Sequence, residues 1–121
     1  MNTLSQIFVA LLAVEHIYIL WLEMFMWTKP LGRKTFSAFP SDLFEKTKGL
    51  AANQGLYNGF LAAGLIWSII ISDPVWSKNI ALFFTCCIIT AGIFGAATAM
   101  RKIFVTQALP AIITLIVLLL F

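Results

Sequence analysis

The segment LLAVEHIYILWLEMFMW, residues 11–27, decides the fold, because it combines a long apolar stretch with three ionisable side chains. Its apolar residues are numerous enough to place it in a lipid bilayer. A charged side chain at the centre of a membrane helix costs about 2.5–3.5 kcal/mol on insertion scales. Glu15, His16 and Glu23 are therefore expected to face a protein interior. The segment predicts a membrane-spanning helix that carries a functional site.

The rest of the chain is equally apolar, with 61% hydrophobic and 11% charged residues over 121 positions. This composition leaves too little polar surface for an ordinary soluble domain. Four segments approach the length of a transmembrane helix, about 20 residues: residues 4–27, 50–71, 79–100 and 103–121. They take up most of the sequence. We therefore expect an all-α fold, an antiparallel bundle of four transmembrane helices forming one integral membrane domain over residues 1–121.

The basic residues predict the orientation of this bundle. Seven of the eight Lys and Arg side chains lie in the connections 28–49 and 101–102. Positively charged loops stay in the cytoplasm, so both termini are expected outside. The net charge of +3 is concentrated at membrane edges and does not indicate nucleic-acid binding. The first segment lacks both the basic start and the small-residue cleavage pattern of a signal peptide, so we expect it to be retained.

The first connection, residues 28–49, is the only long one. Pro30 and Gly32 predict a turn that ends the first helix, because the residue before a proline leaves the helical region. Asp42 and Glu45 have the spacing of a capping box and predict the start of the next helix. The apolar residues among charged ones favour an amphipathic helix lying on the inner leaflet. A gate over a cytoplasmic opening is the alternative.

Small residues recur at every fourth position in the second and third predicted spans. The two ridges consist of Gly55, Gly59 and Ala63, and of Ala91, Gly95 and Ala99. Such ridges allow membrane helices to approach closely. We expect these two spans to pack through them, within one chain or in a homodimer. Pro110 is expected to kink the fourth span.

Helical periodicity gathers the polar side chains of the first two spans on common faces. At about 100° per residue, Glu15, His16 and Glu23 fall within roughly a quarter of the first helix. The second span offers a similar polar face: Asn53, Gln54, Tyr57 and Asn58. The small-residue ridge falls on the other side of that span. We therefore expect the polar faces to meet inside the bundle.

Depth along the helices supports the same expectation. At about 1.5 Å per residue, Glu23 and the Asn53–Gln54 pair lie about 5–6 Å inside the cytoplasmic end, and Gln107 of the fourth span lies at a similar depth. Glu15 and His16 lie near the midplane. We expect one polar cavity that runs from the inner face to the middle of the membrane.

Each polar group has a structural and a functional interpretation. Glu23 is either a working carboxylate or a buried carboxyl satisfied by amides. Glu15 and His16 are either a hydrogen-bonded structural pair or a proton-exchanging pair. The carboxamides either join helices or hold a solute. A metal site is not expected, because the chain has one histidine and no supporting ligand pattern. No cofactor motif is present.

Three strings resemble a known family: VEHIYILWLEMFMW at residues 14–27, ANQGLYNGFLAAGLIW at 52–67 and AGIFGAATA at 91–99. The chain is similar, nearly from end to end, to small bacterial four-span membrane proteins catalogued as a domain of unknown function. The resemblance implies the same four-span fold and a bacterial cytoplasmic membrane location. It implies no activity.

Three functions remain open at this stage. A small carrier or ligand-binding protein fits a polar pocket with titratable groups, and predicts flux that depends on pH and on Glu15. A membrane-embedded acid–base enzyme acting on a lipid or isoprenoid would use the same groups without metal or cofactor. An accessory subunit would use them only for packing. The expected partners are the bilayer, an unidentified small molecule or lipid, and a second copy.

Overall fold

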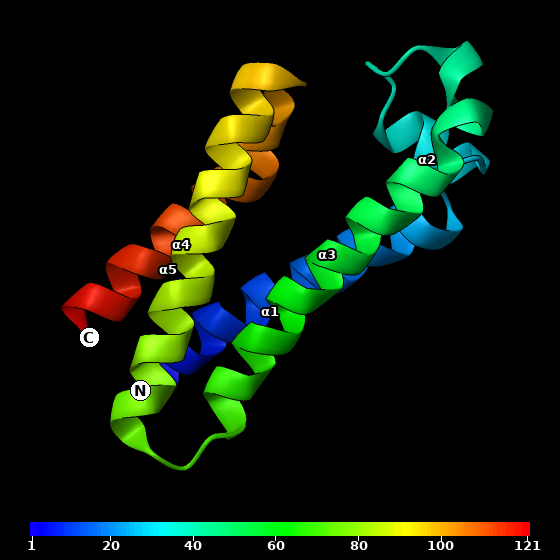
Figure 1. The fold of residues 1–121 in the computed structure, drawn as a ribbon. Helices are drawn as coiled ribbons and strands as arrows, with labels where there is room; N and C mark the ends of the chain where they lie inside the picture. The colour runs from blue at the N-terminus through cyan, green and yellow to red at the C-terminus, as the bar shows by residue number, and fades with distance from the viewer. The chain divides into compact units, whose positions relative to one another are not determined.

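The computed structural model of the protein describes all 121 residues as an all-helical chain (Figure 1). Its elements are α1 (Thr3–Phe25), α2 (Pro30–Thr35), the 3-10 turn η1 (Ser41–Leu43), α3 (Phe44–Ile70), α4 (Pro74–Thr98), the π-helical turn η2 (Phe104–Ala108) and α5 (Leu109–Leu120). The all-α class is confirmed. The four predicted spans correspond to α1, α3, α4 and the continuous helical segment formed by η2 and α5.

Two helices, α1 and α4, are long and apolar enough to cross a membrane. Helix α3 is longer than either, but its polar residues, Asn53, Gln54 and Asn58 among them, lower its mean hydropathy. The helical segment Phe104–Leu120 is apolar but shorter. Length and composition therefore support two spanning helices, fewer than the four that the sequence predicts.

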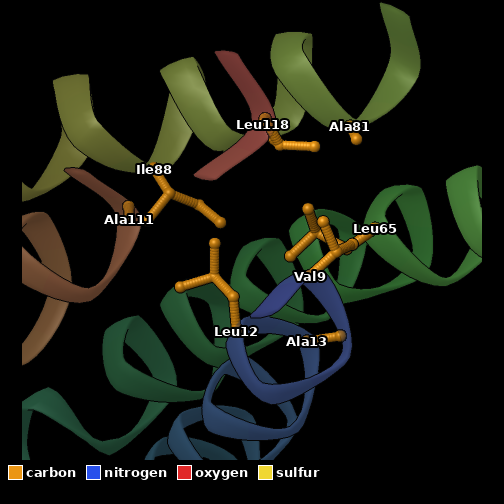
Figure 2. Close-up of a cluster of buried hydrophobic side chains, with 8 residues drawn as sticks. All are labelled: Val9, Leu12, Ala13, Leu65, Ala81, Ile88, Ala111 and Leu118. Carbon is orange, nitrogen blue, oxygen red and sulfur yellow. The ribbon is translucent and has the colours of Figure 1, made fainter. Parts of the chain in front are cut away.

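The chain divides into two compact units, one made of residues 1–14 and 61–121 and the other of residues 15–60. We call them the bundle unit and the hairpin unit. The boundaries fall inside α1 and inside α3. The bundle unit has a continuous apolar core to which four helical segments contribute, as Figure 2 shows. The core residues are Val9, Leu12 and Ala13 of α1, Leu65 of α3, Ala81 and Ile88 of α4, and Ala111 and Leu118 of α5.

The turns of the bundle unit are fixed by local hydrogen bonds. Asp73 caps α4, since its Oδ1 accepts from the backbone N–H groups of Val75 and Trp76 at 2.9 and 3.0 Å. Pro74 follows at the first helical position, where its missing N–H costs nothing. The Ser77 hydroxyl donates to the Ser68 carbonyl at 2.7 Å and closes the connection between α3 and α4.

The small-residue ridges pack differently from the expectation. A Cβ on Gly59 would lie 2.6 Å from Leu20 Cδ1 of α1, so this part of the α3 ridge faces α1. A Cβ on Gly95 would lie 3.1 Å from Ile103, ahead of η2, so the α4 ridge faces the following segment. The predicted packing of the two ridges against each other within the chain is therefore wrong. Helix α3 instead meets α4 through Gly64, which lies against the ring of Phe84.

The last helical segment begins with a π turn rather than a simple kink. The Leu109 N–H bonds to the Phe104 carbonyl, five residues back. Pro110 follows at the start of α5 and has no N–H to continue the α-helical ladder. Gly92 of α4 lies against Ala108, where a Cβ would come within 2.6 Å of the Ala108 backbone nitrogen. The irregular turn is therefore held by close contact with α4.

The connection in the hairpin unit folds around aromatic rings, and from Ser41 onwards it is helical and runs into α3, where the sequence predicted a helix start. Trp27 packs against Phe36, Phe39 and Phe44, with ring centroids 5.0–5.3 Å apart. The Trp27 indole N–H also donates to the Thr47 hydroxyl at 3.1 Å. Pro30 begins a short helix where a turn was expected, since proline suits the first helical position. The connection is therefore a small folded cap with its own aromatic core.

Candidate functional site

Glu23 of α1 and Asn58 of α3 meet inside the hairpin unit. The Asn58 side-chain amide donates to Glu23 Oε1 at 2.7 Å, and both side chains are buried, with 4% and 8% exposure. The same amide also donates to the Gln54 carbonyl at 3.2 Å, which fixes its orientation on α3. The sequence predicted that these two residues belong to one site, and the structure brings them into direct contact.

Gly55 allows that contact to form. A Cβ at this position would lie 2.7 Å from Met24 Cγ and 3.1 Å from the Leu20 carbonyl oxygen, both in α1. Only a residue without a side chain lets the two helix backbones approach this closely. Gly55 lies one turn before Asn58 on α3, so the close approach occurs next to the hydrogen bond. The glycine therefore positions the carboxyl–carboxamide pair.

Glu15 and His16 form a second ionisable pair on α1. His16 is fully buried, and its Nδ1 lies 4.0 Å from Glu15 Oε2. The Glu15 side chain is 29% exposed, yet its Oε2 atom is buried without a hydrogen-bond partner. Buried oxygens of this kind are rare, because an unpaired polar atom loses hydration without compensation. The pair thus places an unpaired acceptor 4.0 Å from an imidazole nitrogen, which is longer than a direct hydrogen bond.

The other predicted polar residues of α3 point away from Glu23. Asn53 and Gln54 are exposed, and Tyr57 is 56% exposed with its ring edge-on to Phe60 at 5.6 Å. Only Asn58 of the predicted polar face is buried against α1. The expected convergence of all four side chains within the hairpin unit is therefore not observed.

Gln107 lies in the bundle unit, in the π turn η2, and is half-buried. Its participation in the site stays a prediction. No group of three His, Cys, Asp or Glu side chains lies close enough together to hold a metal ion. Cys86 and Cys87 are unpaired thiols on α4, the first exposed and the second half-buried.

Sequence reasoning missed the role of Arg33 in the connection. Its Nε donates to the Thr28 carbonyl at 2.9 Å and one terminal nitrogen donates to the Ser41 carbonyl at 3.1 Å. Its guanidinium also lies over the Phe44 ring, 5.0 Å from the centroid, as a cation–π pair. The sequence does place an arginine among four aromatic residues. The basic residues, however, were used only to predict the orientation of the protein in the membrane.

The family model described as "protein of unknown function (DUF1304)" matches residues 10–119. The chain belongs to this family. It is also similar to the uncharacterized protein YpaA of Lactococcus lactis subsp. lactis (strain IL1403), with 32% identity over 117 residues that cover 96% of this chain and 97% of that protein. No solved structure matches the chain. The resemblance seen in the sequence is thus confirmed at the level of the family, which carries no assigned activity.

Proposed function

We propose that this member of the family is a four-span protein of the bacterial cytoplasmic membrane that binds and carries a small solute, with proton exchange at an intramembrane acid site. Residues 1–121 form one domain in this proposal. The connections 28–49 and 101–102 face the cytoplasm, and both termini face outside. The acid site comprises Glu15, His16, Glu23 and Asn58.

Exposed apolar side chains support the membrane location. Leu11 of α1 is 61% exposed, Phe94 of α4 is 69% exposed and Leu120 of α5 is 71% exposed. Water would penalise such a surface, whereas lipid chains cover it at no cost. The lengths of α1 and α4 suit a hydrocarbon layer, and the four segments packed in the bundle unit suit a transmembrane bundle.

The unpaired Glu15 oxygen carries the functional part of the proposal. A purely structural carboxyl inside a bundle is expected to have all its oxygens satisfied. One carboxyl oxygen of Glu23 accepts a hydrogen bond from Asn58. Glu15 Oε2, in contrast, has no hydrogen-bond partner and lies 4.0 Å from His16 Nδ1. Ionisable residues within membrane helices by default mark ion, proton or substrate pathways. We therefore assign proton exchange to Glu15 and His16, and the anchoring of a solute to Glu23.

Native mass spectrometry of the gently extracted full chain tests this proposal. We expect the wild type to carry a discrete bound mass that Glu15→Gln and Glu23→Gln both lose. Glu45→Gln is the matched control, because Glu45 is an exposed carboxylate of the connection, 3.8 Å from Arg33 and outside the site. Glutamine keeps an acceptor for Asn58, so the packing contact survives the substitution.

The identity of the bound mass separates the functions. A solute that crosses proteoliposome membranes in a manner dependent on pH and on Glu15 supports the carrier. A lipid or isoprenoid that is converted without crossing would favour the acid–base enzyme instead. An empty wild type, indistinguishable from both site variants, would overturn the proposal and leave a packing role in a larger complex.

A further inference from the structure

One face of α3 in the hairpin unit is exposed from Leu50 to Phe60. The residues are Leu50, Asn53, Gln54, Tyr57 and Phe60, and we call them the outer face of α3. Their spacings of three and four residues place them on one side of a helix. Leu50 is 72% exposed and Phe60 is 53% exposed, so apolar residues frame the carboxamides and the phenol at both ends.

The other side of α3 is already occupied within the chain. Ala51 and Asn58 are 6% and 4% exposed, and Gly55 between them contacts Met24 of α1. The glycines of the two small-residue ridges likewise face helices of the same chain. Within the hairpin unit, no other helix covers the outer face of α3.

Lipid is a poor occupant of this face if the chain spans the membrane as proposed. Tyr57 lies about 10 Å along the helix from Leu50, at about 1.5 Å per residue, and the two carboxamides lie between them. A carboxamide facing hydrocarbon loses its hydration and gains no hydrogen bond in return. An occupant that offers both donors and acceptors removes this penalty.

We propose that two copies of the chain associate through the outer faces of their α3 helices, side by side and parallel. Copies inserted in the same orientation are related by a twofold axis along the membrane normal, so each residue meets its own counterpart at the same depth. Carboxamides and phenols are both donors and acceptors and can pair with themselves, unlike carboxylates or ammonium groups. None of these five residues is charged, and Lys46 lies one turn before Leu50 at the start of the helix. The stretch from Leu50 to Phe60 is therefore self-complementary.

Disulfide trapping in proteoliposomes tests the interface. Asn53→Cys and Tyr57→Cys are placed separately in a chain with Cys86→Ala and Cys87→Ala. A bridge requires Cα atoms within about 7 Å. Both variants are expected to form dimers under mild oxidation. Leu56→Cys is the matched control, because Leu56 is 42% exposed on the same helix but lies outside the face, and it is expected to stay monomeric.

A second measurement uses the wild-type cysteines and no oxidant. Asn53→Leu combined with Gln54→Leu should lower the dimer fraction in native mass spectra through a roughly tenfold weaker association, since four carboxamides leave the interface. Disulfide trapping at position 56 equal to that at positions 53 and 57 would overturn the proposal. A wild type that is monomeric in native mass spectra, together with cysteine variants that form no disulfide dimer, would also overturn it. So would a different protein trapped in native membranes.

This inference rests on the proposed membrane insertion but not on solute binding. A protein that is trapped as a dimer but carries no bound mass would overturn the carrier and leave the interface standing. A monomer that carries the mass would do the reverse. The two proposals therefore fail separately.

Discussion

The hydrogen bond between Asn58 and Glu23 makes a quantitative prediction about stability. Interhelical hydrogen bonds in membranes contribute about 0.6 kcal/mol on average and up to about 1.7 kcal/mol. This one is short, at 2.7 Å, and both partners are buried. We therefore expect its coupling energy near the upper end, about 1–1.7 kcal/mol. Asn58→Ala alone is expected to cost about 1–3 kcal/mol, because it leaves a buried carboxyl oxygen unpaired.

A double-mutant cycle measures the coupling directly. Asn58→Ala, Glu23→Ala and the double variant are unfolded reversibly by SDS titration from mixed micelles, with helix content followed by circular dichroism. The double variant is expected to be more stable than the sum of the single effects predicts. Glu23→Gln serves as the control and should lose little, since its amide oxygen still accepts from Asn58. Additivity within about 0.5 kcal/mol, the value for independent sites, would refute the reasoning.

Two further predictions concern single side chains in the helices and use the same unfolding assay. Gly55→Ala should destabilise the protein, because its Cβ would collide with α1, whereas Gly49→Ala on the same helix meets nothing within 4 Å and should stabilise it by up to about 1 kcal/mol through helix propensity. Thr85→Val should be neutral or stabilising, since the buried Thr85 hydroxyl has no hydrogen-bond partner. Thr114→Val should cost about 1 kcal/mol, because it removes the hydrogen bond from the Thr114 hydroxyl to the Pro110 carbonyl at 2.9 Å. The reverse order within either pair would contradict these packing arguments.

The helices could be predicted from the sequence because their signals are local. Apolar length predicted α1 and α4, but α4 begins at Pro74, before the predicted start at residue 79, because Asp73 caps the helix there. The connection could not be predicted in the same way. Its helix at Pro30–Thr35 is accompanied by a tertiary contact, since Gly32 lies directly against the Met26 carbonyl. Four aromatic rings and Arg33 then complete a fold that periodicity does not reveal.

The candidate site was predictable in part for a geometric reason. Helical periodicity placed Glu23 and Asn58 on polar faces that were expected to meet, and these two side chains are hydrogen-bonded. It did not decide which part of the broad polar arc of α3 faces α1. In the structure Gly55 faces α1 and Asn58, one turn later, lies on the same side of α3, whereas Asn53 and Tyr57 are exposed. The predicted pairing of the two ridges was wrong because small residues allow close helix packing but do not specify which helix is the partner.

The π turn at Phe104–Ala108 has a consequence for how chain length can vary in this family. A π turn holds one residue more than the α-helical turn it replaces. Losing one residue between Phe104 and Ala108 would convert it to an α-helix and leave the contacts before and after the turn in register. This turn is therefore where a single-residue deletion can be absorbed in the last helix, whereas the same deletion within α5 would rotate every following side chain by about 100°.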